Sequence, residues 1–179
     1  PFLLIDEAVL LANLDRLANY TARHGIHLRP HAKTHKSLWL GRRQLERGAL
    51  GLTVAKPGEA EVFAAIASDL LLAYPVVDAA TARRVALLAR DIDLKVAVDS
   101  EHAIAVLADA ARQAGSTIGI LIDQDIGMHR TGVGTTAEAL SLAEKVEQAS
   151  CLRLRGLFCY PGHIWAPAAK QPDLLREAC

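Results

Sequence analysis

Short apolar segments alternate with amphipathic segments along almost the whole chain, and this pattern limits the fold more than any other feature. Strands that alternate with helices are typical of an α/β chain with a parallel sheet. The chain shows no low-complexity tract or linker, so we expect one domain over residues 1–179. The apolar segments predict strands at residues 2–5, 26–33, 50–55, 69–77, 93–98, 117–123 and 152–160.

Side chains that cap helix N-termini stand before the amphipathic segments. Glycines follow two of these segments, where a helix commonly ends. Pro57 opens another helix, because proline is well tolerated in the first turn. The expected helices lie at residues 6–22, 37–47, from 57, 78–90, 100–115 and from 135 or 136 to 148, with caps at Asp6, Ser37, Asp78, Ser100 and Thr135 or Thr136.

The sequence is compatible with two arrangements of the parallel sheet. One is an open, doubly wound sheet, and the other is a (β/α)8 TIM-type barrel. A complete barrel takes about 250 residues, whereas this chain has 179 and about six strand–helix units. A barrel is therefore possible only if the chain is an incomplete part of one.

The amino-acid composition bears on which molecules the protein can bind. Lys+Arg and Asp+Glu both number 20, which argues against a nucleic-acid partner because such proteins carry a basic footprint. No apolar run approaches the roughly 20 residues that span a membrane. The cysteines Cys151, Cys159 and Cys179 fit no zinc spacing, so we expect no metal site and reduced thiols in a cytoplasmic protein.

Residues 28–37 gather two histidines, one arginine and two lysines at the end of an apolar strand. Strand alternation places Arg29, His31 and Lys33 on one face. Burial there would favour the neutral amine that a Schiff-base lysine requires, beside cations that hold an anionic cofactor. The alternative is that these are solvated loop residues beyond a shorter strand. Lys36 is the rival nucleophile, closer to the helix cap.

Arg130 follows another predicted strand end. Its guanidinium could donate to a phenolate or a carboxylate of a ligand. The alternative is an ion pair with Asp123 or Asp125. In the glycine-containing segment that follows, residues 132–137 match G-x-G-x-x-A, but we reject a dinucleotide site because no acid ends the next strand.

Tyr160 ends the last predicted strand and could stack on a ring or donate from its hydroxyl. An ordinary tyrosine at a barrel rim is the alternative. His129 and His163 are candidate acid–base groups, or histidines with a structural hydrogen bond.

The segment Arg29 to Lys36 resembles the lysine signature of the D-threonine aldolase and D-serine dehydratase family. That family has the pyridoxal-phosphate (PLP) barrel of fold type III, as in alanine racemase. Supporting motifs occur in the same order along nearly the whole chain. They are Thr53–Ala55, Gly58–Glu61, Val98–Ser100, Ile122–Asp123, Gly127, His129–Val133, Gly156–Leu157, Tyr160 and Gly162–His163.

The resemblance implies a cofactor site and an incomplete barrel. Lys33 would form the Schiff base with PLP, beside His31, with Arg130 near the phenolate oxygen and Tyr160 as an active-site tyrosine. Residues 1–179 would be the N-terminal part of the barrel. The phosphate cradle and a C-terminal β-domain with ligands for manganese, magnesium or zinc would lie outside this chain, and the protein would be a homodimer.

The implied activity is that of a PLP-dependent lyase acting on small D-β-hydroxy-α-amino acids. D-threonine aldolase, which cleaves its substrate to glycine and an aldehyde with metal assistance, is the first expectation. D-serine or D-3-hydroxyaspartate dehydratase is the alternative within the family. A non-catalytic PLP-binding protein is the alternative from another class.

Overall fold

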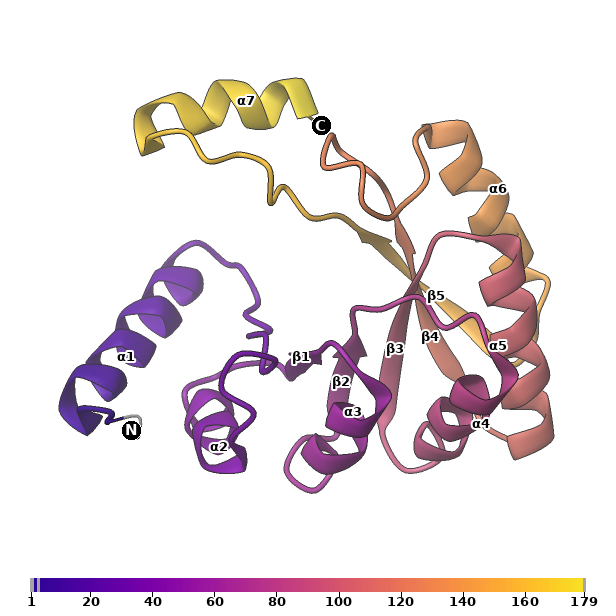
Figure 1. Cartoon of the computed structure of the whole chain (residues 1–179), viewed down its shortest axis with the longest axis horizontal. Helices are drawn as coiled ribbons and strands as arrows, with labels where there is room; N and C mark the ends of the chain where they lie inside the picture. The colour runs from indigo at the N-terminus through magenta and orange to yellow at the C-terminus, as the bar shows by residue number, and fades with distance from the viewer. Residues whose placement is uncertain (1, 3, 179) are drawn as a thin grey trace. The chain divides into compact units, whose positions relative to one another are not determined.

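The computed structural model of the chain describes residue 2 and residues 4–178 (Figure 1). Its contacts define two compact units. The first comprises the residues up to Ala73 together with Asp91–Leu94. The second comprises Tyr74–Arg90 and the residues from Lys95 onward. The strands have the parallel order β1-β2-β3-β4-β5, as an α/β fold requires.

The first unit contains two short parallel strands. Leu52 of β1 pairs with Leu70 of β2, and Val54 pairs with Leu72. These four side chains and Phe63 are almost completely buried and form the core of this unit. Its elements are α1 (Glu7–Arg23), α2 (Leu38–Glu46), β1 (Leu52–Val54), α3 (Pro57–Phe63) and β2 (Asp69–Leu72).

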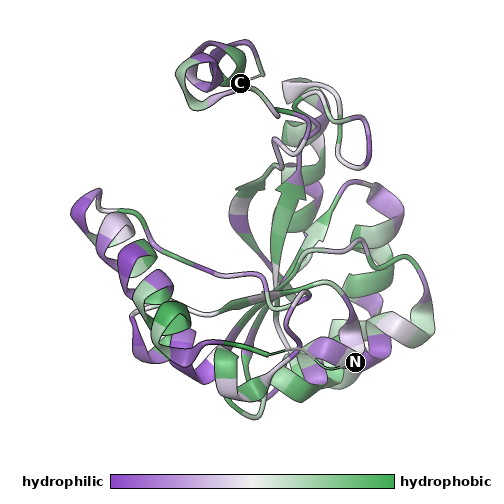
Figure 2. Cartoon of the chain, turned by 60° about the vertical axis from the view of Figure 1, so that its left-hand side comes forward, coloured by the Kyte–Doolittle hydropathy of each residue, from purple (hydrophilic) through white to green (hydrophobic). Residues whose placement is uncertain are grey.

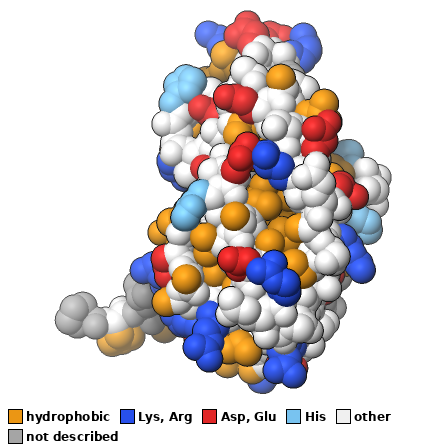
Figure 3. Space-filling view, turned by 90° about the vertical axis from the view of Figure 1, so that its right-hand side faces the viewer, with side chains coloured by type: hydrophobic (Ala, Val, Ile, Leu, Met, Phe, Trp, Pro, Cys, Tyr) orange, Lys and Arg blue, Asp and Glu red, His pale blue; other side chains and the backbone are white. Residues whose placement is uncertain are grey.

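The second unit is built on β3, β4 and β5, with helices packed against each other and against β4 and β5. The strands are rich in hydrophobic residues (Figure 2), and Ile118, Ile120 and Ile122 of β4 are fully buried. Hydrophobic side chains also gather among charged ones on the surface that Figure 3 shows. The elements of the second unit are α4 (Ala79–Leu88), β3 (Asp93–Val98, which begins in the first unit), α5 (Glu101–Ala114), β4 (Ile118–Asp123), α6 (Thr136–Glu147), β5 (Leu152–Phe158), η1 (Ala168–Lys170) and α7 (Gln171–Ala178).

The helix starts predicted from the sequence are confirmed. The side chains of Asp6, Ser37, Asp78 and Ser100 each accept a backbone N–H from the first turn of the helix that follows. Thr135 does the same for α6, in a reciprocal capping box with Glu138. Gly115 ends α5 with a φ of 65°, a conformation that a side chain disfavours.

Two of the predicted strands are wrong. Phe2, Leu4 and Ile5 lie in no strand and are strongly exposed, and Leu3 lies outside the described residues. Residues 26–33 are not a regular strand, because they form only one bridge, between His31 and Thr53. The predicted strand at 152–160 ends at Phe158, and the sequence did not predict η1 or α7.

Within the described part of the chain, no helix combines the length and hydrophobicity needed to cross a bilayer. This agrees with the absence of a long apolar run in the sequence.

Truncating a core leucine tests the packing of the second unit. Leu107 of α5 is fully buried, whereas Leu140 of α6 is 60% exposed. We expect Leu107→Ala to lower the free energy of unfolding by about 2–5 kcal/mol, because it leaves a cavity. Leu140→Ala is the matched control and should change it by less than about 0.5 kcal/mol. Urea unfolding measures both, and equal effects would contradict the assigned core.

Candidate active site

Residues 31–37, here called the lysine loop, form a tight turn beside β1. The N–H of Ala32 donates to the Thr53 carbonyl at 2.8 Å, and Ala32 is fully buried. The N–H of Lys36 donates back to the Ala32 carbonyl at 2.9 Å and closes the turn. The loop therefore starts from a fixed point beside the middle residue of β1.

Lys33 lies in this turn with an exposed side chain. The expectation of a buried, desolvated amine is therefore wrong, since the extended segment ends at His31. Among the described residues, no hydrogen bond or ion pair engages the Lys33 amine. The Lys36 ammonium is instead paired with the Glu59 carboxylate. Of these two lysines, Lys33 is the one whose amine is available to a ligand.

His31 contacts the backbone of Lys33, two residues further along the chain. Its Nδ1 accepts the N–H of Lys33 at 3.3 Å, so a neutral His31 carries its proton on Nε2. Burial and the nearby Lys33 charge lower the pKa of His31, although the charge of Glu59 and a hydrogen bond to the Thr53 backbone oppose this shift. His31 is accordingly neutral at pH 7.

Arg29 has a structural partner within the first unit. Its guanidinium forms a two-point ion pair with Asp69 at the start of β2, with Nη2 and Oδ2 3.0 Å apart. A Cβ at Gly51 would collide with Arg29 and with the Asp69 backbone, so glycine is required for this pair to form. Arg29 is therefore not available to a ligand.

In the second unit, residues 124–133, here called the arginine loop, carry Arg130 from the end of β4. The N–H of Asp125 donates to the Val133 carbonyl at 2.9 Å, and the N–H of Val133 donates to the Asp123 carbonyl at 3.0 Å. Gly132 has a φ of 99°, and a Cβ there would lie 2.5 Å from the Asp125 nitrogen. Only glycine permits this close return of the chain.

Asp125 holds the turn of the arginine loop. Its Oδ1 accepts the backbone N–H groups of Gly127 and His129, both at 3.0 Å, and its Oδ2 lies 2.8 Å from His129 Nδ1. These contacts, led by the His129 N–H, lower the pKa of Asp125 to about 2. Asp125 thus pairs with His129. His129 therefore makes the structural hydrogen bond that the sequence analysis gave as the alternative to an acid–base role.

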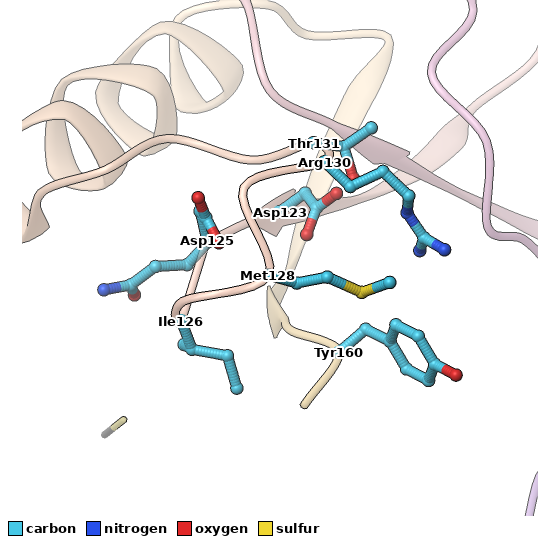
Figure 4. A pocket seen from close by; sticks show the side chains of 8 residues that line it. Asp123, Asp125, Ile126, Met128, Arg130, Thr131 and Tyr160 are labelled. Carbon is cyan, nitrogen blue, oxygen red and sulfur yellow. The ribbon is translucent and has the colours of Figure 1, made fainter. Parts of the chain in front are cut away.

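The Arg130 guanidinium lies over the ring of Tyr160, 5.0 Å from its centroid. This is the distance of a cation–π contact. Figure 4 shows Arg130, Met128 and Tyr160 extending to the same side of a hollow that Asp123, Asp125, Ile126 and Thr131 also line. The space inside it is about 10 Å³, far below the roughly 300–1,000 Å³ of typical ligand pockets. The hollow can therefore contact only part of a ligand.

Asp123 is 7% exposed at the end of β4. Burial raises its pKa, and the hydrogen bond from Thr131 and the charge of Arg130 offset this only in part. The sequence placed Asp123 at a strand end, within one of the motifs of the family resemblance, and offered it as a possible ion-pair partner of Arg130. His163 is exposed and lies near Gly127, where an added Cβ would be 3.0 Å from its Nε2.

Each unit thus brings together part of the expected cofactor site. His31 and Lys33 adjoin in the first unit, and Arg130 and Tyr160 adjoin in the second.

Comparison with known proteins identifies the family. Residues 5–178 match the family described as alanine racemase, N-terminal domain. The chain belongs to this family. The family assignment agrees with the resemblance seen in the sequence, and with the parallel α/β architecture.

Individual relatives of this alanine racemase N-terminal domain are lyases. It is 35% identical to the D-threonine aldolase of an Arthrobacter species, over 99% of this chain and 48% of that protein. It is 34% identical to the D-threo-3-hydroxyaspartate dehydratase of Delftia sp. HT23, over 98% of this chain and 49% of that protein. The crystal structure of D-threonine aldolase from Filomicrobium marinum matches with a TM-score of 0.96 and 32% identity, over 99% of this chain and 49% of that one. The chain spans about half the length of these relatives.

The Asp125 contacts predict a pH-dependent contribution to stability. Because the pKa of Asp125 in the fold is about 2, below its ordinary value of 3.8, its ionised form stabilises the fold above about pH 4. That stabilisation is lost as the pH falls from about 4 towards 2. We expect Asp125→Asn to unfold at a lower urea concentration at pH 6, and this difference to shrink towards pH 3.

The control for this experiment is Asp109→Asn. Asp109 is an exposed residue paired with Arg112 one helical turn away, so its loss should have little effect at either pH. A stability difference for Asp125→Asn that stays constant from pH 6 to pH 3 would contradict the assigned contacts.

Proposed function

We propose that the protein containing this chain is a PLP-dependent lyase of small D-β-hydroxy-α-amino acids, with D-threonine aldolase activity. The observation that carries this proposal is the unpartnered amine of Lys33, on a loop whose other lysine is ion-paired. The 35% identity to a D-threonine aldolase over 99% of this chain supports it.

The donor set of the chain fits PLP. Lys33 offers a primary amine for the cofactor's aldehyde, and Arg130 offers a planar cation with five N–H donors for its phenolate oxygen. The ring of Tyr160 already supports the Arg130 guanidinium, which reduces the ordering needed when a ligand binds. We propose that Lys33, His31, Arg130 and Tyr160 hold this cofactor. When bound, PLP supplies an electron sink for the bonds at the substrate's Cα.

The residues of the chain then have distinct tasks. Lys33 gives or takes the proton at the substrate's Cα once its amine is free. His31, neutral at pH 7, donates from Nε2 and adds no second positive charge beside Lys33. Arg130 stays protonated throughout and orients an oxyanion without exchanging its proton.

A divalent metal also enters the proposal, because the family resemblance implies one. Among the described residues, no group of three or more His, Cys, Asp or Glu side chains could hold a metal ion. The side chains that the structure describes therefore do not fit a metal ion. We propose that the ligands for manganese, magnesium or zinc lie outside this chain, in a cytoplasmic homodimer that binds neither nucleic acid nor membranes.

Product analysis distinguishes the aldolase from its alternative. With D-threonine and added manganese, an aldolase releases acetaldehyde and glycine, whereas a dehydratase releases 2-oxobutanoate and ammonia. We expect glycine and acetaldehyde in equal amounts from D-threonine, and neither from L-threonine. The 34% identity to a D-threo-3-hydroxyaspartate dehydratase makes the keto acid the second candidate product. A protein that binds PLP but forms neither product would be a non-catalytic binder.

Removing the Lys33 amine tests the cofactor assignment. We expect Lys33→Ala to lose the yellow colour after dialysis and to leave no PLP fixed by borohydride, because the covalent link requires that amine. Lys56→Ala is the matched control, since Lys56 is an exposed lysine before α3 whose side chain makes no capping contact. A Lys33→Ala protein that still fixes PLP would show that another lysine carries the cofactor. The readout is visible absorbance with peptide mass spectrometry.

A further inference from the structure

Glu59 connects three parts of the first unit. It lies in the first turn of α3, and its side chain is only 11% exposed. Its Oε2 accepts the backbone N–H of Ala55, just beyond β1, at 2.9 Å. Its Oε1 pairs with the ammonium of Lys36 in the lysine loop. One carboxylate thus ties the end of β1, the start of α3 and the loop that carries Lys33.

Lys36 is held in an unfavourable backbone conformation. Its φ is 48°, in the left-handed region that residues with a side chain rarely adopt. Such a conformation persists only where surrounding contacts impose it. The contacts here are the hydrogen bond from the Lys36 N–H to Ala32 and the ion pair with Glu59. Lys33 lies in the turn between Ala32 and Lys36, which these contacts hold in place.

An acid in the first turn of a helix has a simpler role, since it interacts favourably with the helix dipole. That role explains why Glu59 stands near the start of α3, but it requires no lysine from another element. Burial opposes the ionisation of Glu59, yet the Lys36 ammonium and the N–H groups of Ala55 and Lys56 lower its pKa overall. Glu59 is therefore charged at neutral pH and can pair with the Lys36 side chain.

The consequence concerns which lysine reacts. A lysine condenses with an aldehyde only as the neutral amine: nitrogen adds to the carbonyl carbon, the oxygen leaves as water, and a carbon–nitrogen double bond forms. Lys36 is paired as its ammonium, whereas the amine of Lys33 has no partner among the described residues. We propose that Glu59 is a positioning residue that directs PLP to Lys33 by engaging Lys36 in an ion pair and fixing the loop. This inference rests on the proposed function of Lys33.

Reductive trapping measures the choice between the two lysines directly. The whole apoprotein is mixed with PLP, reduced with borohydride and digested, and the ratio of label on Lys36 to label on Lys33 is read by mass spectrometry. Glu59→Gln keeps an oxygen for the Ala55 N–H but loses the charge. We expect this ratio to rise by about two- to fivefold, which corresponds to the loss of one partly exposed ion pair.

Glu61→Gln is the matched control, because Glu61 is an exposed glutamate on the same helix. Its labelling ratio should equal that of the wild type. An unchanged ratio in Glu59→Gln would overturn the inference and leave the cofactor role of Lys33 standing. Label absent from Lys33 in the wild type would overturn both.

A second variant guards against misfolding of Glu59→Gln. Lys36→Met keeps Glu59 and its contact with Ala55, so the start of α3 is preserved. It removes one attachment of the loop, and we expect Lys33 to be labelled about two- to fivefold more slowly. An unchanged labelling rate, with a circular dichroism melt like that of the wild type, would show that Glu59 and Lys36 do not position Lys33.

Discussion

The backbone hydrogen bonds between residues 28–32 and the segment around β1 are the interaction on which the candidate site depends. The Leu28 carbonyl accepts from Leu50 at 2.9 Å, and the Pro30 carbonyl accepts from Thr53 at 2.8 Å. The Thr53 carbonyl then accepts from Ala32. A lysine side chain has many rotamers, so the position of its amine depends first on a fixed backbone. These bonds bring that fixed backbone to within one residue of Lys33.

Helix starts and strands differ in how well the sequence predicted them, and the reason is the range of the interactions. An N-cap such as Ser37 or Ser100 bonds to a residue three positions away, so the signal is complete within the local sequence. A strand needs a partner that the local sequence does not specify. Residues 26–33 have a suitable apolar pattern, yet they bond to β1 over too short a stretch to form a regular strand.

The candidate site shows the same difference between features that local sequence predicts and features that depend on distant residues. Positions at predicted strand ends, and then the family resemblance, identified Lys33 and Arg130 as candidate site residues. Neither could show that Lys36 pairs with Glu59, because those residues stand 23 positions apart. Alternation assumed that the strand continues through Lys33, whereas its exposure matches the alternative of loop residues beyond a shorter strand. The sequence left open whether Asp123 or Asp125 pairs with Arg130. The partners that the structure gives Asp125 depend on a turn in which His129 and two glycines have a left-handed φ.

The two cations proposed to hold the cofactor are prepared in different ways, each within its own unit. The lysine loop is fixed by backbone bonds and by an ion pair that engages the neighbouring lysine, so Lys33 keeps a free amine. Arg130 lies over an aromatic ring, on a turn whose Asp125 carboxylate bonds to His129. A reactive amine must be able to lose its proton, whereas an anion-binding group must keep its charge. The opposite treatment of the two cations follows from these opposite requirements.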